Sequence, residues 1–210
     1  MLRFSFLLLF VLLLTACTHG QDGVEPRLIG TCEGCEAVFE YGDRSLGPVD
    51  TLPGFASGQT RIKVTGTIFQ PDGKTPAEGV ILYVYHTDEQ GLYSPGPNPE
   101  GWERRHGDDR GWIKTGADGR YTFYTFRPGV YPNRAEAAHI HPTILEPDGK
   151  HYWLGSYYFS DDPLLTDTHR NPRNPRGGSA GVMTLRREGD LWVGERDFVL
   201  GKHVSGYPRS

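Results

Sequence analysis

Short apolar runs separated by tight turns fill the sequence from Thr60 onward, and this pattern constrains the fold more than any other feature. Runs such as TRIKVTGTIFQ, GVILYVYHT and RYTFYTF are rich in β-branched and aromatic residues, and Pro, Asp, Gly and Lys lie between them. In RYTFYTF, Tyr121 and Phe123 share one face, whereas Thr122 and Tyr124 share the other. No segment of this region keeps a period near 3.6 over ten or more residues. We therefore expect an all-β fold with few helices.

The turns predict how the strands connect. Three hairpins are expected around GADG, PDGK and EGD, over residues 111–126, 138–159 and 181–200. Short antiparallel strands with hairpin turns and Greek-key-length connections are typical of a β-sandwich or a partly closed barrel.

The charge balance excludes one class of partner. Charged residues are 23% of the chain and the net charge is −4, so the sequence lacks the basic surface that nucleic-acid binding requires. The 28 Gly and 16 Pro are spread between the apolar runs, which indicates many turns and not a disordered tract.

The first sixteen residues, MLRFSFLLLFVLLLTA, have the pattern of a secretory signal: one Arg, an apolar run from Phe4 to Leu14, then small residues. The apolar run is shorter than the about 20 residues of a spanning helix. Residues 14–17 resemble the lipobox of bacterial lipoproteins, in which the Cys is acylated and becomes the mature N-terminus. We expect an exported lipoprotein of the bacterial cell envelope, anchored to the membrane through Cys17. A simple secretory signal with an incidental Cys is the alternative.

The mature chain divides by composition into two parts. Residues 17–58 are rich in Gly, Asp, Glu and Pro, which predicts a tether that lies along the domain, and residues 59–210 form the expected β domain. The tether carries Cys32 and Cys35 in GTCEGCE. In an exported chain this spacing fits a structural disulfide, a redox pair or half of a zinc site. We favour the disulfide, because neither further zinc ligands nor a βαβ pattern is evident; free thiols are the next alternative.

Two histidines in VYPNRAEAAHIHPTI suggest a metal site. Residues two apart in a strand project to the same side, so His139 and His141 point together. Pro142 lacks an N–H and predicts a sheet edge or an interrupted ladder, either of which leaves room for a ligand. Taken alone, such a pair is more often solvated or hydrogen-bonded than metal-bound.

The surrounding residues carry a family resemblance. The pattern T-x-A-D-G-x-Y-x-F-x-T-x-x-P-G-x-Y-P, followed at short range by H-I-H, resembles the intradiol ring-cleavage dioxygenases, the family of catechol and protocatechuate dioxygenases. Upstream GTIFQPDGKTPAEGVILYVYHTDEQGLYS and downstream SYYFSDDPLL are similar to segments of the same family. The likeness extends roughly from Lys63 to Leu165.

The resemblance implies a non-haem ferric ion held by four side chains, namely Tyr93, Tyr131, His139 and His141. Fe(III) is a hard ion and phenolate is a hard anionic donor, and a free Tyr, with a pKa of about 10, ionises at neutral pH only on a strong Lewis acid. The implied reaction is the cleavage of a catechol-type diol by O₂ to a muconate-type diacid. Tyr131 is then the ligand that the diol displaces, and it accepts a substrate proton. Oligomers are common in the family.

Three positions depart from the family pattern. Glu136 stands where the family usually has an Arg that stabilises the anionic substrate ring, and we expect Arg134 to take this catalytic role. Ser156 stands where some members carry Gln, and Pro142 replaces a residue that is commonly aromatic. Two alternatives therefore stay open. One is an iron-binding relative without turnover; the other is a non-enzymatic scaffold like the carboxypeptidase regulatory and transthyretin modules, whose turn patterns the chain shares.

Other aromatic and basic residues are not expected to bind the metal. The loop with Trp102, Arg104, Arg105 and His106 is expected to be solvated, with the rim of a pocket as the alternative. For His86 a surface position is expected. Packing, not metal binding, is expected for the remaining tyrosines of the β runs: Tyr83, Tyr85, Tyr121, Tyr124, Tyr157 and Tyr158.

Overall fold

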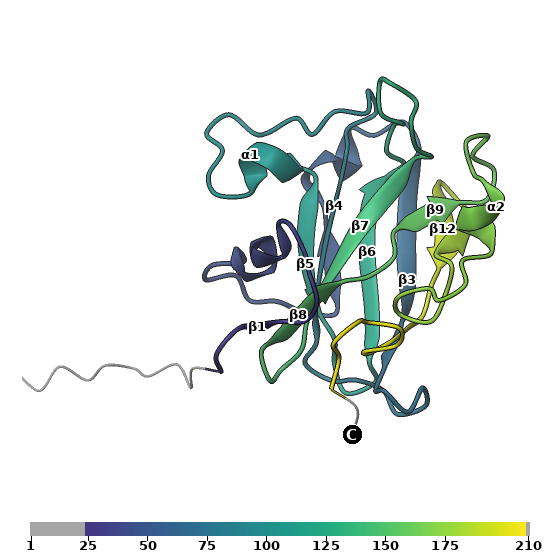
Figure 1. Ribbon diagram of the computed structural model, residues 1–210. Coiled ribbons are helices and arrows are strands. Elements are labelled where there is room, and N and C mark those ends of the chain that lie inside the picture. The colour runs from purple at the N-terminus through teal and green to yellow at the C-terminus, as the bar shows by residue number, and fades with distance from the viewer. Residues whose placement is uncertain (1–23, 209–210) are drawn as a thin grey trace, which may run out of the picture.

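The computed structural model describes residues 24–208, in which two β-sheets pack face to face (Figure 1). The expected secretory signal and Cys17 lie outside the described residues. Within residues 24–208, no helix has the length and apolar character needed to cross a membrane.

Seven strands form the first sheet, which carries both histidines of the H-I-H motif. Its central order is β1-β8-β7-β4-β5, and β9 and β10 extend it from β7. The strands are β1 (Arg27–Leu28), β4 (Ile81–His86), β5 (Arg110–Lys114), β7 (His139–Leu145), β8 (Lys150–Trp153), β9 (Tyr157–Phe159) and β10 (Val182–Met183).

Six strands form the second sheet, in the order β11-β12-β3-β6-β2 with β13 paired to β3. They are β2 (Val49–Thr51), β3 (Arg61–Phe69), β6 (Arg120–Phe126), β11 (Arg186–Glu188), β12 (Leu191–Glu195) and β13 (Phe198–Val199). The described helices are single short pieces: η1 (Cys35–Phe39), η2 (Pro53–Ala56), α1 (Glu103–His106) and α2 (Asp167–Arg170). The prediction of an all-β fold is confirmed, and the arrangement is a sandwich without a closed barrel.

One predicted hairpin is wrong. The strands on either side of GADG do not pair, because β5 is antiparallel to β4 in the seven-stranded sheet whereas β6 is antiparallel to β3 in the six-stranded sheet. The turn therefore carries the chain from one sheet to the other. A Greek-key crossing and a hairpin use the same turn residues, so local sequence does not distinguish them. The other two turns join antiparallel pairs as predicted, β7 with β8 and β11 with β12.

The two faces of the seven-stranded sheet bury different sets of side chains. On the inner face, alternate residues of β4 and β7 join the core between the sheets: Leu82, Val84, Ile140 and Ile144. On the outer face a second apolar cluster contains Ile81, Tyr83, Trp112 and Leu145. His141 shares this outer face, since it lies opposite Tyr85 in the β4–β7 register. The histidine pair is thus on the outside of the sandwich, not between its sheets.

The segment from residue 24 to residue 58 covers part of this outer face. Its first strand, β1, is parallel to β8, and its second strand, β2, is parallel to β6. Between them, Cys35, Ala37 and Val38 of η1 are buried, the latter two in the outer cluster. The predicted tether thus contributes strands and apolar side chains to the sandwich, which places its loops beside the histidines.

The ladder along β7 is interrupted beside Pro142. On its β4 side, β7 is paired from Ile140 to Leu145, so the strand is internal and the expectation of a sheet edge is wrong. On its other side, β9 pairs with His139 and Ile140, and β8 pairs with Thr143 to Leu145. Between β8 and β9 the chain leaves β7, at residues 154–156. Pro142, which has no N–H to donate, lies at this break. The prediction of an interrupted ladder is therefore confirmed.

Candidate metal centre

The four predicted ligands converge at one point. The hydroxyl oxygens of Tyr93 and Tyr131 lie 2.7 Å apart, and the Tyr93 oxygen lies 2.9 Å from Nε2 of His141. The Nε2 atoms of His139 and His141 are also 2.9 Å apart, and the Tyr131 oxygen lies 3.2 Å from Nε2 of His139. Two oxygens and two nitrogens from three separate segments therefore share one small space.

Two loops that carry the tyrosines are tied together by their backbones. The Gly129 N–H donates to the Asp88 carbonyl at 2.9 Å, and the Thr87 hydroxyl donates to the Gly129 carbonyl at 2.9 Å. Gly91 has φ +79°, and a side chain there would collide with the Val130 carbonyl oxygen. The G-x-Y turn thus needs glycine both for its left-handed backbone and for close contact with the loop of Tyr131.

Each imidazole is held in an orientation suited to a ligand. Nδ1 of His139 donates to the Ala137 carbonyl at 2.7 Å, so the lone pair of Nε2 is directed at the centre. His141 is held instead by stacking on Tyr85, with ring centroids 4.6 Å apart and planes 15° apart. The opposite face of Tyr85 stacks on His106 at 3.8 Å and 5°. Nδ1 of His106 in turn lies 2.8 Å from the Tyr83 hydroxyl.

Burial sets the protonation of the centre in the metal-free protein. It raises the pKa of Tyr93, and the hydrogen bond with Tyr131 raises it further. Burial also raises the pKa of Tyr131 and holds the pKa of His141 well below its usual range. At neutral pH the phenols are therefore protonated and His141 is neutral. Neutral imidazole is the form that binds metals, whereas both phenols must lose a proton to become anionic ligands.

The donor set fits a ferric ion. Within residues 24–208, no group of three or more His, Cys, Asp or Glu side chains could hold a metal, so this site depends on its two phenols. Two phenolates provide hard anionic oxygen for a trivalent ion, and imidazole suits iron as well. A ferric ion is also a strong enough Lewis acid to ionise tyrosines whose pKa values burial has raised.

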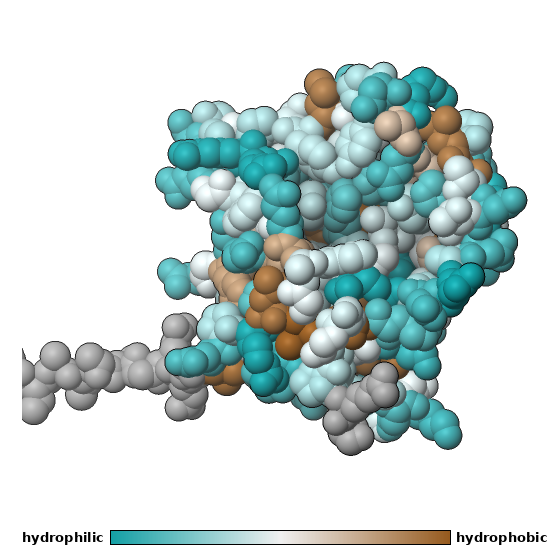
Figure 2. Space-filling model, in the orientation of Figure 1, coloured by the Kyte–Doolittle hydropathy of each residue, from teal (hydrophilic) through white to brown (hydrophobic). Residues whose placement is uncertain are grey.

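A large cavity opens beside the centre. It has a volume of about 830 Å³, and its wall includes His141, Tyr85, Tyr158 and the break at residues 154–156. In Figure 2, which shows the face of Figure 1, a recess lies between the side of α1 and the side of β9. A smaller cavity of about 230 Å³ touches Tyr93, Tyr131 and His141 from the side of α1. The centre is thus reached from two sides.

The three departures from the family pattern all line the large cavity: Glu136, Pro142 and Ser156. The Glu136 carboxylate accepts a hydrogen bond from the Tyr158 hydroxyl at 2.8 Å. Arg134 is exposed in the turn after Tyr131, with φ 52° and its N–H donating to the Tyr131 carbonyl at 2.7 Å. Its side chain borders neither cavity, whereas Glu136 faces the large one.

The tether residues and the loop of α1 complete the walls. The chain from Thr31 to Gly34 borders the large cavity, and Cys32 and Cys35 are joined in a disulfide with Cα atoms 5.8 Å apart. Trp102, Arg105 and His106 border the small cavity, so this loop forms a rim. Glu33 and Arg105 form an ion pair of 2.8 Å between the two segments.

Three residues behave differently from the sequence interpretation. The expected surface position of His86 is wrong: the residue is buried on the inner face, with Nε2 2.6 Å from the Thr125 hydroxyl and Nδ1 2.7 Å from the Thr87 carbonyl. Tyr85 and Tyr158, interpreted as packing, border the site. The two-residue period correctly predicts that Tyr85 and Tyr83 share a face of the strand. Only the sheet register shows that this face carries the site.

Comparisons with known proteins agree with these observations. No protein-family model matches the chain. The sequence is 31% identical over 166 residues to catechol 1,2-dioxygenase 1 of Acinetobacter lwoffii, which covers 71% of this chain and 50% of that protein. It is 32% identical over 150 residues to the protocatechuate 3,4-dioxygenase beta chain of Burkholderia cepacia, covering 60% of this chain and 58% of that protein.

A solved structure is similar over nearly its whole length. This is the dioxygenase domain of a dioxygenase and carbohydrate-binding protein fusion from Streptomyces sp. SirexAA-E, with a TM-score of 0.55 and 26% identity, covering 84% of this chain and 98% of that chain. The homologues and structural neighbours of this chain are therefore intradiol ring-cleavage dioxygenases. The chain spans about half the length of its two sequence relatives, at 50% and 58%.

Proposed function

We propose that this protein is an intradiol ring-cleavage dioxygenase that uses a non-haem ferric ion, O₂ and a catechol-type aromatic diol. The observation that carries the proposal is the convergence of Tyr93, Tyr131, His139 and His141, whose donor atoms lie 2.7–3.2 Å from their nearest neighbours in the set. The similarity to two dioxygenases supports the same reaction class.

The four side chains would hold the iron, with the phenols as its anionic ligands. When bound, the ferric ion supplies Lewis acidity and draws electron density from a chelating diol, so that the ring becomes reactive toward O₂. For the diol to bind, the protein's own side chains must then accept protons from it. A diol that binds as a dianion releases two protons, and the protein must accept at least one of them.

Tyr131 is placed to accept such a proton. It is half-buried, and the four residues that follow it are exposed, so its loop has room to move. Because burial raises the pKa of its phenol, a Tyr131 phenolate released from a metal would take up a proton readily. The Tyr93 hydroxyl keeps its 2.9 Å contact with Nε2 of His141 when Tyr131 moves. The ring of the diol would then lie in the large cavity bordered by His141.

An optical experiment tests the proposal. Tyrosinate bound to Fe(III) gives an intense visible charge-transfer band, so the protein supplied with ferric iron is expected to be burgundy and to consume O₂ with catechol. Tyr131→Phe should weaken the band and slow turnover, whereas the matched Tyr124→Phe, in β6 of the other sheet, should change neither. A colourless protein with less than stoichiometric iron would contradict both metal binding and the reaction.

A second candidate function is iron binding without turnover. The observation that favours it is the position of Glu136, which brings a carboxylate to the cavity, whereas Arg134 lies outside its wall. A negative charge there opposes the anionic ring that the reaction develops. A coloured protein with a full iron site but no O₂ uptake with catechol, hydroxyquinol or protocatechuate would favour this candidate.

We propose further that the chain is an exported lipoprotein anchored through Cys17. The signal pattern of residues 1–16 and the disulfide between Cys32 and Cys35 support an oxidising compartment. Labelling of bacteria that express the chain with a radioactive or clickable fatty acid is expected to mark the wild type and not Cys17→Ala. Equal labelling of both proteins would contradict the lipid anchor.

A further inference from the structure

One carboxylate in the wall of the large cavity has no cationic partner. Glu136 borders this cavity and is partly buried, and within residues 24–208 its side chain makes one hydrogen bond, accepted from the Tyr158 hydroxyl at 2.8 Å. A carboxylate can accept about four hydrogen bonds through its two oxygens, so most of its capacity is free. Glu136 forms no ion pair with any described residue. A negative charge with little compensation therefore faces the cavity.

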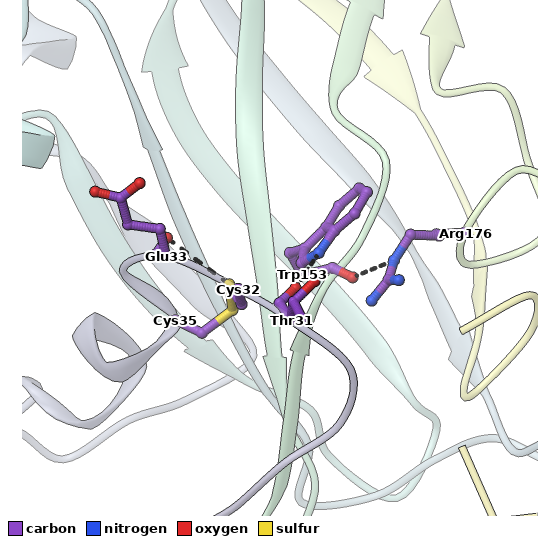
Figure 3. Close-up of a disulfide and its surroundings, with 6 residues drawn as sticks. All are labelled: Thr31, Cys32, Glu33, Cys35, Trp153 and Arg176. Atoms are coloured by element: carbon purple, nitrogen blue, oxygen red, sulfur yellow. Dashed lines mark hydrogen bonds between the residues drawn. A yellow bond between two sulfur atoms is a disulfide. The ribbon is translucent and has the colours of Figure 1, made fainter. Parts of the chain in front are cut away.

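The cations of the surrounding chain are engaged or lie elsewhere. Arg105, on the rim, pairs with Glu33 at 2.8 Å. Arg134 is exposed and borders neither cavity. The guanidinium carbon of Arg176 lies 3.9 Å from the centroid of the Trp153 ring, and Figure 3 shows this pair beside the disulfide loop. A cation from outside the chain is thus the natural complement of the unpaired carboxylate.

The sheet register places the carboxylate beside the metal centre and Arg176 away from it. Tyr158, whose hydroxyl holds the carboxylate, lies opposite His139 in the ladder between β7 and β9. Trp153, on which Arg176 stacks, lies opposite Thr143 in the ladder between β7 and β8. These two positions on β7 are four residues apart, which corresponds to about 13 Å. The end of the cavity beside the metal ligand is therefore the negative one.

Aromatic rings line the cavity near this carboxylate. The centroid of the Tyr158 ring lies 5.8 Å from that of His139 and 4.7 Å from that of His169. Tyr85 and His169 border the same cavity. The face of a tyrosine ring attracts an ammonium group, and the attraction between opposite charges strengthens where aromatic walls displace water. A carboxylate among such rings suits an organic cation, whereas it repels an anion.

We propose that Glu136 and Tyr158 form a subsite for an ammonium group of the substrate, so that the protein prefers catechols with an aminoalkyl side chain to neutral or acidic ones. The inference rests on the proposed function, because it takes the diol to be bound at the four-ligand centre. The cavity, of about 830 Å³, has room for the ring and a short side chain. The ammonium group donates to the Glu136 carboxylate and lies against the Tyr158 ring. It also neutralises a charge that otherwise opposes the anionic ring.

The test compares three diols of nearly the same shape that differ in charge. Iron-loaded full-length protein is supplied with 3,4-dihydroxyphenethylamine, 3,4-dihydroxyphenethyl alcohol and 3,4-dihydroxyphenylacetate, and kcat and KM are measured for each. The amine is a cation at neutral pH. We expect kcat/KM for the amine to exceed that for the alcohol by roughly tenfold or more, mainly through KM, and the acid to be the poorest substrate. A wild type that does not distinguish the amine from the alcohol overturns the proposal.

Variants of Glu136 test which group carries the preference. Glu136→Gln keeps the shape of the side chain and an oxygen for the Tyr158 hydroxyl but removes the charge, so it should abolish the preference for the amine. Glu136→Lys reverses the charge and should favour the acid over the amine, a result that a merely weakened fold would not produce. Glu188→Gln removes the same charge at an exposed position on β11 of the other sheet and should keep the preference. A Glu136→Gln variant that still prefers the amine overturns the proposal.

A binding experiment separates this proposal from the proposed reaction. Isothermal titration calorimetry measures the binding of the amine and of the alcohol to iron-free protein, where no turnover is possible. If the chain cleaves no diol, the reaction fails, but tighter binding of the amine that is lost in Glu136→Gln still supports the subsite. If diols are cleaved but the amine is neither bound nor turned over better than the alcohol, the subsite alone is refuted.

Discussion

The ring of Tyr85 lies directly opposite His141 across β4 and β7, and the two rings stack with centroids 4.6 Å apart. His106 stacks on the other face of Tyr85 with ring centroids 3.8 Å apart. The rings of His106, Tyr85 and His141 therefore form one continuous stack that ends at a proposed metal ligand. His139 has its Nδ1 hydrogen bond to Ala137, whereas His141 is positioned mainly by this stacking. The two ligands therefore depend on different kinds of support.

Tyr85 is expected to position His141 through its ring and not through its hydroxyl. Tyr85→Ala removes the ring, so we expect iron affinity to fall by roughly tenfold or more, as is typical when the support of a ligand is lost. Tyr85→Phe keeps the ring and should keep the affinity. Competition with a chelator, followed through the visible band, measures both. Equal affinity in Tyr85→Ala and wild type would show that the stacking has no part in metal binding.

Arg134→Ala is expected to leave the visible band intact and to lower kcat by roughly tenfold. Arg134 borders neither cavity in this structure, but it lies in the exposed loop after Tyr131, and movement of that loop with Tyr131 would bring its guanidinium to the anionic ring without binding the metal. The exposed Arg173 in the loop before Arg176 provides a control with the same change of charge. Steady-state O₂ uptake measures both variants. If Arg134→Ala and Arg173→Ala have the same kcat as wild type, the cation expected in place of the family Arg is not Arg134.

Reduction of the Cys32–Cys35 disulfide is expected to cost about 2 kcal/mol of folding free energy, because the bond closes a very short loop. For a chain of this size the corresponding fall in Tm is about 4–8 °C. Thermal unfolding followed by circular dichroism, with and without reductant, measures it. The double variant Cys32→Ser with Cys35→Ser should have the lower Tm already and should not respond to reductant. A reductant effect that persists in this variant would have another cause.

His86 is expected to destabilise the fold in acid. Burial lowers its pKa to about 4 in the folded protein, against 6.5 for an unperturbed histidine. Between pH 6.5 and 4 the unfolded chain binds a proton that the folded chain does not, so the unfolded state gains stability as pH falls. This contributes a loss of about 3 kcal/mol by pH 4, and the contribution is absent above pH 6.5.

Urea unfolding of the metal-free protein at several pH values measures this effect. His86→Gln cannot titrate and should show a smaller loss of unfolding free energy between pH 7 and pH 4 than wild type. His203→Gln, at an exposed position, should match the wild-type slope. If His86→Gln and wild type lose equal stability over this range, the acid sensitivity comes from other groups.

Much of this protein follows from local sequence. The two-residue period of RYTFYTF and HIHPTIL determines which side chains share a face, and turn residues determine where strands end, because both depend on backbone geometry over a few residues. The four candidate ligands, by contrast, were indicated by the resemblance of the sequence to the intradiol dioxygenase family. The residue types of these ligands agree with the chemistry of the metal, since a hard trivalent ion prefers anionic oxygen donors and also binds imidazole.

Tertiary structure alone decided how these pieces meet. The GADG turn crosses between sheets, and His86 points into the core while His141 points out, because strand pairing over long sequence separations selects the face that each strand buries. The cavity wall joins residues 31–34, 153–156 and Arg176, which no local pattern connects. Within residues 24–208, Nη2 of Arg176 is the single buried side-chain atom without a hydrogen bond, and this too is a property of packing, because only the folded chain determines which polar atoms lose contact with water.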